Sequence, residues 1–209
     1  MDLKKLHIGT VSYGKDTSDE VTSLLKASFA QSVDSSSSAN SFRNRRDLTT
    51  RIRDVVQALA LCHNVTPVVE GDGIMYQAAS PDEIAIVRWT ASVGLALSHR
   101  DLSRMTLEFQ SGQTFDFDIL QVFPFTSETK RMGIIVRDLQ TQEIVFYMKG
   151  ADSVMAKIVE YNDWLQEECE NMSREGLRTL VIGKRRLTQE QYDSFERKLA
   201  WFSNRRWLF

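Results

Sequence analysis

The stretch FPFTSETKRM (residues 123–132), together with MKGAD (residues 148–152), decides the fold of this chain. Between them, residues 133–138 and 143–148 are rich in β-branched and aromatic side chains, and the polar turn LQTQ (residues 139–142) separates the two runs. This pattern predicts a β-hairpin that returns the chain to the end of the sheet from which it started.

Phe125, Lys130 and Lys149 are the candidate ligand-binding residues of this hairpin, because it brings one aromatic ring and two ammonium groups to one end of a sheet. Such a surface suits a purine nucleotide: the base stacks on the ring, worth about 1 kcal/mol beyond area burial, and the phosphates meet the cations. The residues alone also allow a plain structural interpretation, with the ring in the core and both lysines solvated. Pro124 argues against the core position because it bends the strand and removes a ladder donor.

Hairpin after hairpin, with helices before and after, predicts an α+β fold: an antiparallel sheet of about six to seven strands flanked by helices. We expect a connecting segment at residues 1–17, one domain at 18–200 with a mobile serine-rich and basic loop at 32–46, and a tail at 201–209. Expected helices are 18–31, 48–63 (capped by Asp47), 81–93, 153–159, 162–174 and 189–201. A turn is expected at 66–73, and strands at 74–79, 95–98, 104–110, 114–122 and 177–183.

Composition excludes several classes of protein. The net charge of −2, with both signs interspersed, does not indicate a general nucleic-acid binder. No run of about 18 apolar residues occurs, so we expect no direct membrane insertion of this chain. Cys62 and Cys169 lack metal or redox spacing and are expected to be reduced, packed thiols.

The chain resembles the nucleotide-binding domain of P-type ATPases through four motifs in the family's order: SPDE (80–83), FTS followed by KRM (125–132), KGAD (149–152) and GLRTL (176–180). The SPDE form and the KRM ending resemble the type IV branch, the phospholipid flippases. ALCHNVTP (60–67) and YNDWL (161–165) resemble the endosomal and Golgi subgroup of that branch.

This resemblance implies binding of ATP with Mg²⁺ on the cytosolic face of an endosomal or Golgi membrane. It implies that the domain presents the γ-phosphate to an aspartate in a domain absent from this chain, because the DKTGT motif is missing. The implied partners are ATP or ADP and the phosphorylation, actuator and membrane domains of the same pump. The implied binding residues are Phe125 for the base, Glu83 for its amino group, and Ser127, Lys130, Lys149 and Arg178 for the rest of the nucleotide.

Alternatives remain for individual residues. Ser80 as an N-cap and Pro81 at the first helical position explain the SPDE motif as an ordinary helix start. Arg178 equally suits a structural ion pair. Gly150 is expected to let the backbone pass close to a ligand, and Thr129 stands where the family usually has a basic residue.

The sequence contains no GxGxxG and no Walker loop, so nucleotide affinity must come from stacking and point charges. We therefore expect weak binding, near millimolar, or about −4 kcal/mol. With no acceptor aspartate motif, no catalytic residue and no metal-ligand set, the chain is expected to bind ATP without hydrolysing it. The alternative function is a regulatory or protein-interaction module that acts through its serine-rich loop and aromatic, basic tail.

Overall fold

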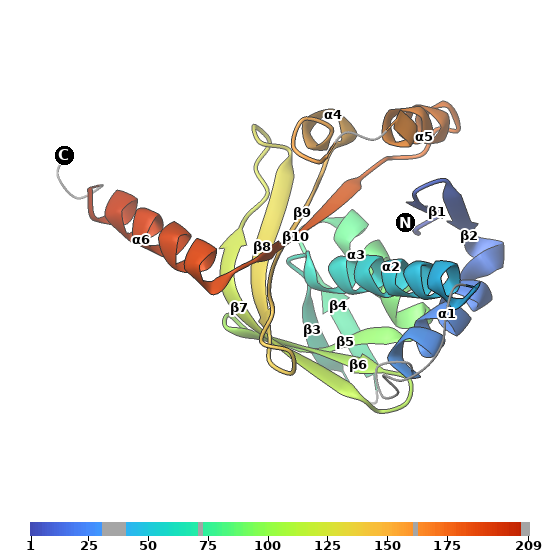
Figure 1. Cartoon of the computed structure of the whole chain (residues 1–209), viewed down its shortest axis with the longest axis horizontal. Coiled ribbons are helices and arrows are strands. Elements are labelled where there is room, and N and C mark those ends of the chain that lie inside the picture. Colours follow the sequence, from blue (N-terminus) through green and yellow to red (C-terminus); the bar gives the residue numbers. More distant parts are fainter. Residues whose placement is uncertain (31–40, 71–72, 161–162, 206–209) are drawn as a thin grey trace.

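A computed structural model describes residues 1–30, 41–70, 73–160 and 163–205 of the chain. Its centre is a six-stranded antiparallel sheet in the order β10-β9-β8-β7-β6-β5 (Figure 1). The strands are β5 (Leu95–Arg100), β6 (Arg104–Phe109), β7 (Thr114–Phe123), β8 (Arg131–Asp138), β9 (Ile144–Gly150) and β10 (Val181–Leu187). The predicted α+β class and the central β8–β9 hairpin are both confirmed.

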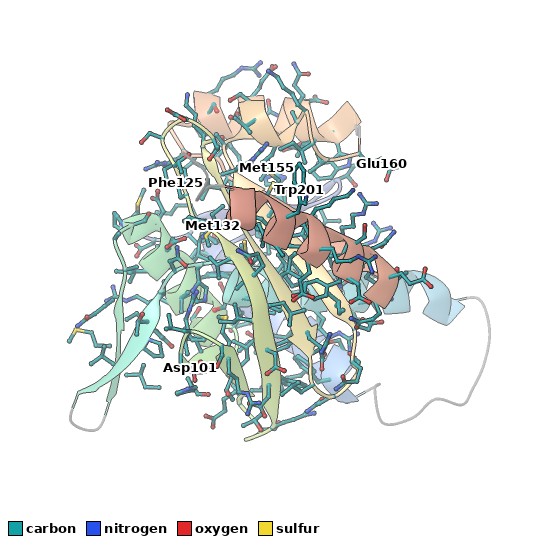
Figure 2. All side chains as sticks on the ribbon, turned by 90° about the vertical axis from the view of Figure 1, so that its left-hand side faces the viewer. Asp101, Phe125, Met132, Met155, Glu160 and Trp201 are labelled. Atoms are coloured by element: carbon teal, nitrogen blue, oxygen red, sulfur yellow. The ribbon has the colours of Figure 1, made fainter. Side chains whose placement is uncertain are left out.

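Both faces of this sheet carry buried apolar side chains. Successive side chains of a strand point to opposite faces, so one strand contributes residues to both. Along β8, Ile134 and Val136 enter the main core, while Ile135 enters a second cluster on the other face. The main core lies under the helices α1 (Ser18–Ala30), α2 (Ser41–Leu61) and α3 (Pro81–Ser92). The helix α6 (Gln189–Arg205) begins on the opposite face, where its residues Tyr192 and Phe195 join the second cluster (Figures 1 and 2).

Two small hairpins flank the main sheet: β1 (Lys5–Ile8) with β2 (Val11–Gly14), and β3 (Thr66–Glu70) with β4 (Gly73–Gln77). The expectation of a turn at 66–73 was wrong. Pro67 lies inside β3, opposite Tyr76. A two-stranded sheet leaves one edge of each strand unpaired, and such an edge tolerates a residue without an N–H group.

The remaining helices lie at the end of the sheet where β8 begins and β9 ends (Figure 1). They are the single turn α4 (Asp152–Met155) and the helix α5 (Asp163–Arg174), which packs Cys169 against Met155 and Val181. Gly176, with φ +75°, follows this helix, in the left-handed conformation that glycine often adopts after a helix end. Cys62 and Cys169 are both free and buried, which confirms the prediction of packed thiols.

Several predicted boundaries differ from the structure. The helix expected at 153–159 is the single turn α4 and ends at Met155. The helix α2 begins at Ser41, so the basic part of the expected loop at 32–46 is helical from that residue onward, and residues 31–40 lie outside the described ranges. The strand expected at 177–183 begins only at Val181. The last helix continues to Arg205, and residues 206–209 of the expected tail are not described.

No helix within the described ranges combines the length and the apolar character needed to cross a bilayer.

Candidate functional site

The turn between β7 and β8 is a closed, internally bonded structure. The amide of Lys130 donates a hydrogen bond to the carbonyl of Thr126 at 2.8 Å, and the Thr126 hydroxyl accepts one from the amide of Thr129 at 3.1 Å. Lys130 adopts φ +49°, a left-handed conformation that is uncommon outside glycine and concentrated at functional sites. These bonds hold the backbone from Thr126 to Lys130, which directly follows Phe125.

Phe125 lies outside the core, with 59% of its surface exposed. Its neighbour Phe123 instead packs on the sheet, with its ring centroid 5.6 Å from that of Phe146 and 5.8 Å from that of Phe195. Figure 2 shows Phe125 at the upper end of the sheet. The core interpretation of Phe125 is therefore wrong, and its ring is available to a ligand.

Lys149 is a buried cation that pairs with the carboxylate of Glu83. It lies on β9 opposite Met132 of β8 and Ile182 of β10, and only 7% of its surface is exposed. Its Nζ atom is 2.9 Å from Oε1 of Glu83, which is itself largely buried at the start of α3. Apart from this ion pair, Nζ has no hydrogen-bond partner among the residues that the structure describes. Buried donors are normally bonded, so the ammonium group is placed to receive a further acceptor.

A cavity of about 680 Å³ opens beside Lys149. Its walls come from β1, α2, α3, α5 and residues 176–182, and most of them are apolar. Of the predicted site residues, Lys149 and Arg178 line the cavity, whereas Glu83, Phe125, Ser127 and Lys130 do not. The other charged residues of the lining are Asp2, Lys4, Lys5, Asp82 and Glu168. The structure thus brings Lys149 and Arg178 together at the cavity and leaves the aromatic turn outside it.

Arg178 and Asp82 form a second ion pair at the start of α3, with 2.8 Å between their nitrogen and oxygen atoms. The arginine side chain is 67% exposed, so the pair is accessible to solvent. The structural alternative for Arg178 is therefore seen in the structure, although the residue precedes β10 and does not lie within it. Adjacent carboxylates of the SPDE motif hold both cations, Asp82 holding Arg178 and Glu83 holding Lys149.

Ser80 occupies the predicted N-cap position of α3, but its side chain makes no capping hydrogen bond. Its carbonyl oxygen accepts the amide of Glu83 at 3.2 Å instead. The position of Ser80 and the presence of Pro81 thus agree with a helix start, while the side-chain capping contact of Ser80 is absent.

Gly150 has a role in the packing of the sheet itself, apart from the close ligand approach expected from the sequence. A Cβ atom at this position would lie 2.7 Å from the carbonyl oxygen of Lys130 on the adjacent strand. The same oxygen accepts a hydrogen bond from the amide of Ala151 at 3.0 Å. Gly150 is therefore required by the close approach of the two motif stretches to each other.

Three residues of the site escaped the sequence analysis: His63, Asn64 and Arg100. The amide of Asn64 donates to Oε2 of Glu83 at 3.2 Å, which occupies the second oxygen of that carboxylate. Arg100 contacts both His63 and Asn64. His63 and Asn64 lie within the ALCHNVTP stretch and Arg100 follows the strand expected at 95–98, but none of these signals indicates a contact with the SPDE motif.

The described residues contain no cluster of three or more His, Cys, Asp or Glu side chains that could hold a metal ion.

Stability should fall below about pH 6.5 because of His63. Burial first, and then the charges of Arg100 and Lys149, lower the pKa of His63 well below its usual value. Below about pH 6.5 the imidazole of His63 binds a proton in the unfolded chain but not in the folded chain. The free energy of unfolding therefore decreases by up to ~1.4 kcal/mol per pH unit as the pH falls. It is fully present above that pH.

Urea unfolding at pH 7.5, 6.5 and 5.5 measures this slope. His63→Gln should flatten it. Equal slopes for the parent and His63→Gln would contradict the assignment.

The family of the chain follows from comparison with known proteins. A family model described as P-type ATPase, cytoplasmic domain N, matches residues 51–206. The chain therefore belongs to the cytoplasmic N domains of P-type ATPases, as the four motifs indicated.

Its relatives are named as phospholipid-transporting ATPases. The chain is 51% identical to "Probable phospholipid-transporting ATPase IIB" of Danio rerio, over 95% of this chain and 20% of the relative. It is 53% identical to "Phospholipid-transporting ATPase NEO1" of Saccharomyces cerevisiae, over 95% of this chain and 18% of the relative. It is 49% identical to "Probable phospholipid-transporting ATPase tat-5" of Caenorhabditis elegans, over 94% of this chain and 18% of the relative. The chain thus spans about a fifth of the length of these relatives.

Proposed function

We propose that this chain is the ATP-binding domain of a phospholipid-transporting P-type ATPase, on the cytosolic face of an endosomal or Golgi membrane. Family membership and relatives of about 50% identity support the class of pump. The observation that carries the binding site is the buried ammonium of Lys149, which keeps N–H bonds without a partner among the described residues and faces a carboxylate of the SPDE motif.

In this proposal the base stacks on the exposed ring of Phe125, and Glu83 accepts a hydrogen bond from the adenine amino group. Lys149 forms the floor of the pocket, while Lys130 and Arg178 meet the phosphates. The Ser127 hydroxyl adds a polar contact. Mg²⁺ enters with the nucleotide and is held by its phosphates, because the described part of the chain offers no cluster of metal-ligating side chains.

The domain contributes positioning. It holds the nucleotide so that the γ-phosphate meets an aspartate carried by a phosphorylation domain outside this chain. Converting a bimolecular encounter into an oriented one removes a large entropic part of the barrier. Weak binding suits this role, because ADP has to leave after each transfer.

The test is a titration of the 209-residue protein with Mg-ATP, followed by amide chemical shifts. Shifts are expected to cluster at Phe125, Glu83 and Lys149, with a dissociation constant near 1 mM, which corresponds to about −4 kcal/mol. Lys149→Ala should abolish them. Lys184→Ala is the matched control, since it removes another partly buried ammonium, one paired with Asp54 of α2 at 2.8 Å. A Lys149→Ala protein that responds to ATP like the parent would overturn the proposal.

A further inference from the structure

Arg100 is tied to the segment that follows α2. One guanidinium nitrogen of Arg100 donates to the carbonyl of His63 and lies 3.5 Å from the carbonyl of Val65. The other lies 3.3 Å from Oδ1 of Asn64. A single side chain at the end of β5 thus contacts all three residues of the segment 63–65.

His63 locks the same segment from within the core. Its side chain is fully buried, and its Nε2 atom lies 2.8 Å from the carbonyl of Ala60. Its Nδ1 atom accepts the amide of Val65 at 3.1 Å and also lies 3.0 Å from Arg100. These partners require a proton on Nε2 and a lone pair on Nδ1, so the imidazole is neutral. The ring and the guanidinium together leave the segment 63–65 little freedom.

The segment 63–65 also contacts the candidate site directly. The amide of Asn64 donates to Oε2 of Glu83 at 3.2 Å, while Oε1 of Glu83 lies 2.9 Å from Nζ of Lys149. The two oxygens of one carboxylate are thus divided between the backbone of the segment and the buried ammonium. Because Lys149 has no other hydrogen-bond partner among the described residues, its position depends on the orientation of Glu83.

We propose that Arg100 is a positioning residue for nucleotide binding: through the backbone of residues 63–65 it orients Glu83, and through Glu83 it orients Lys149. This inference rests on the proposed function. Arg100 does not touch the nucleotide itself, and its guanidinium acts because its planar fork spans several acceptors that a lysine ammonium does not match.

Arg100→Lys is the main variant, since it keeps the charge and loses the fork. Its dissociation constant for Mg-ATP should rise about tenfold, as for the loss of one well-oriented charged hydrogen bond. Its preference for ATP over ITP, which lacks the 6-amino group, should also fall, because a freed Glu83 no longer selects that group. Lys184→Met, which breaks the ion pair between β10 and α2 outside this network, should change neither quantity.

A double-mutant cycle separates positioning from general destabilisation. If Arg100 acts through Glu83, Arg100→Lys should have little further effect on ATP affinity in a Glu83→Gln background. The exchange of the Asn64 amide with solvent should be faster in Arg100→Lys than in the parent. This second measurement stays informative where a variant is too unstable for titration.

The outcomes are distinguishable from those of the proposed function. Parent-like ATP affinity and ATP/ITP preference in Arg100→Lys, with binding lost in Lys149→Ala, would overturn the positioning role and leave the binding site intact. Additive effects of Arg100→Lys and Glu83→Gln would also overturn it. Unchanged binding in Lys149→Ala would instead remove the site on which the inference rests.

Discussion

Lys149→Met should lower the free energy of unfolding by about 3 kcal/mol, because it leaves a buried carboxylate without its cation. The Glu83 side chain is only 12% exposed, so water replaces the lost ammonium poorly. The apolar stem of methionine retains most of the packing of the lysine stem. The expected loss is therefore electrostatic, and urea unfolding at pH 7 measures it.

The double variant Lys149→Met/Glu83→Gln should recover at least half of this loss, because it removes both charges. Lys184→Met provides the control. It breaks an ion pair whose side chains are 24% and 34% exposed, so its effect should stay near 1 kcal/mol. Strictly additive effects of the two substitutions at positions 149 and 83 would show that the pair is not coupled, contrary to the geometry.

Phe125→Ala should weaken Mg-ATP binding about tenfold and leave the free energy of unfolding within about 0.5 kcal/mol of the parent. The ring is exposed, so removing it costs the fold little, while the base loses its stacking surface. Calorimetric or NMR titration gives the affinity, and urea unfolding gives the stability.

Phe123→Ala should show the opposite pattern, because that ring packs between Phe146 and Phe195. We expect a stability loss of about 2 kcal/mol and little direct effect on affinity. If Phe125→Ala binds ATP as the parent does, the stacking role is wrong. If it unfolds instead, the exposed position of the ring is wrong.

Much of the fold could be predicted because its signals are local. Residues close together in the sequence are enough to predict the two strands on either side of residues 139–142. The same holds for the pairing of Thr188 with Gln191. The latter forms a capping box, in which the Gln191 amide donates to the Thr188 hydroxyl at 3.2 Å and the Thr188 amide to the Gln191 side chain at 3.0 Å. The position of Phe125 followed from Pro124, which ends the regular strand alternation.

The pairing within the site could not be predicted, since it depends on contacts between distant elements. Glu83 meets Lys149 because the start of α3 lies near the end of β9, and Asp82 meets Arg178 in the segment between α5 and β10. The contacts of Arg100 with His63 and Asn64 depend on how β5 packs against the end of α2. The periodicity of apolar residues in helices and strands carries no information about these contacts between distant elements.

The carboxylate of Asp82 already forms an ion pair with Arg178 in this structure. A phosphate that arrives there would have to exchange with this resident carboxylate, so part of its attraction to the guanidinium would be offset by intramolecular competition. The same carboxylate would reclaim the arginine as the phosphate departs. Under the proposed function, an ion pair at the mouth of the cavity thus favours rapid turnover of occupants over tight retention.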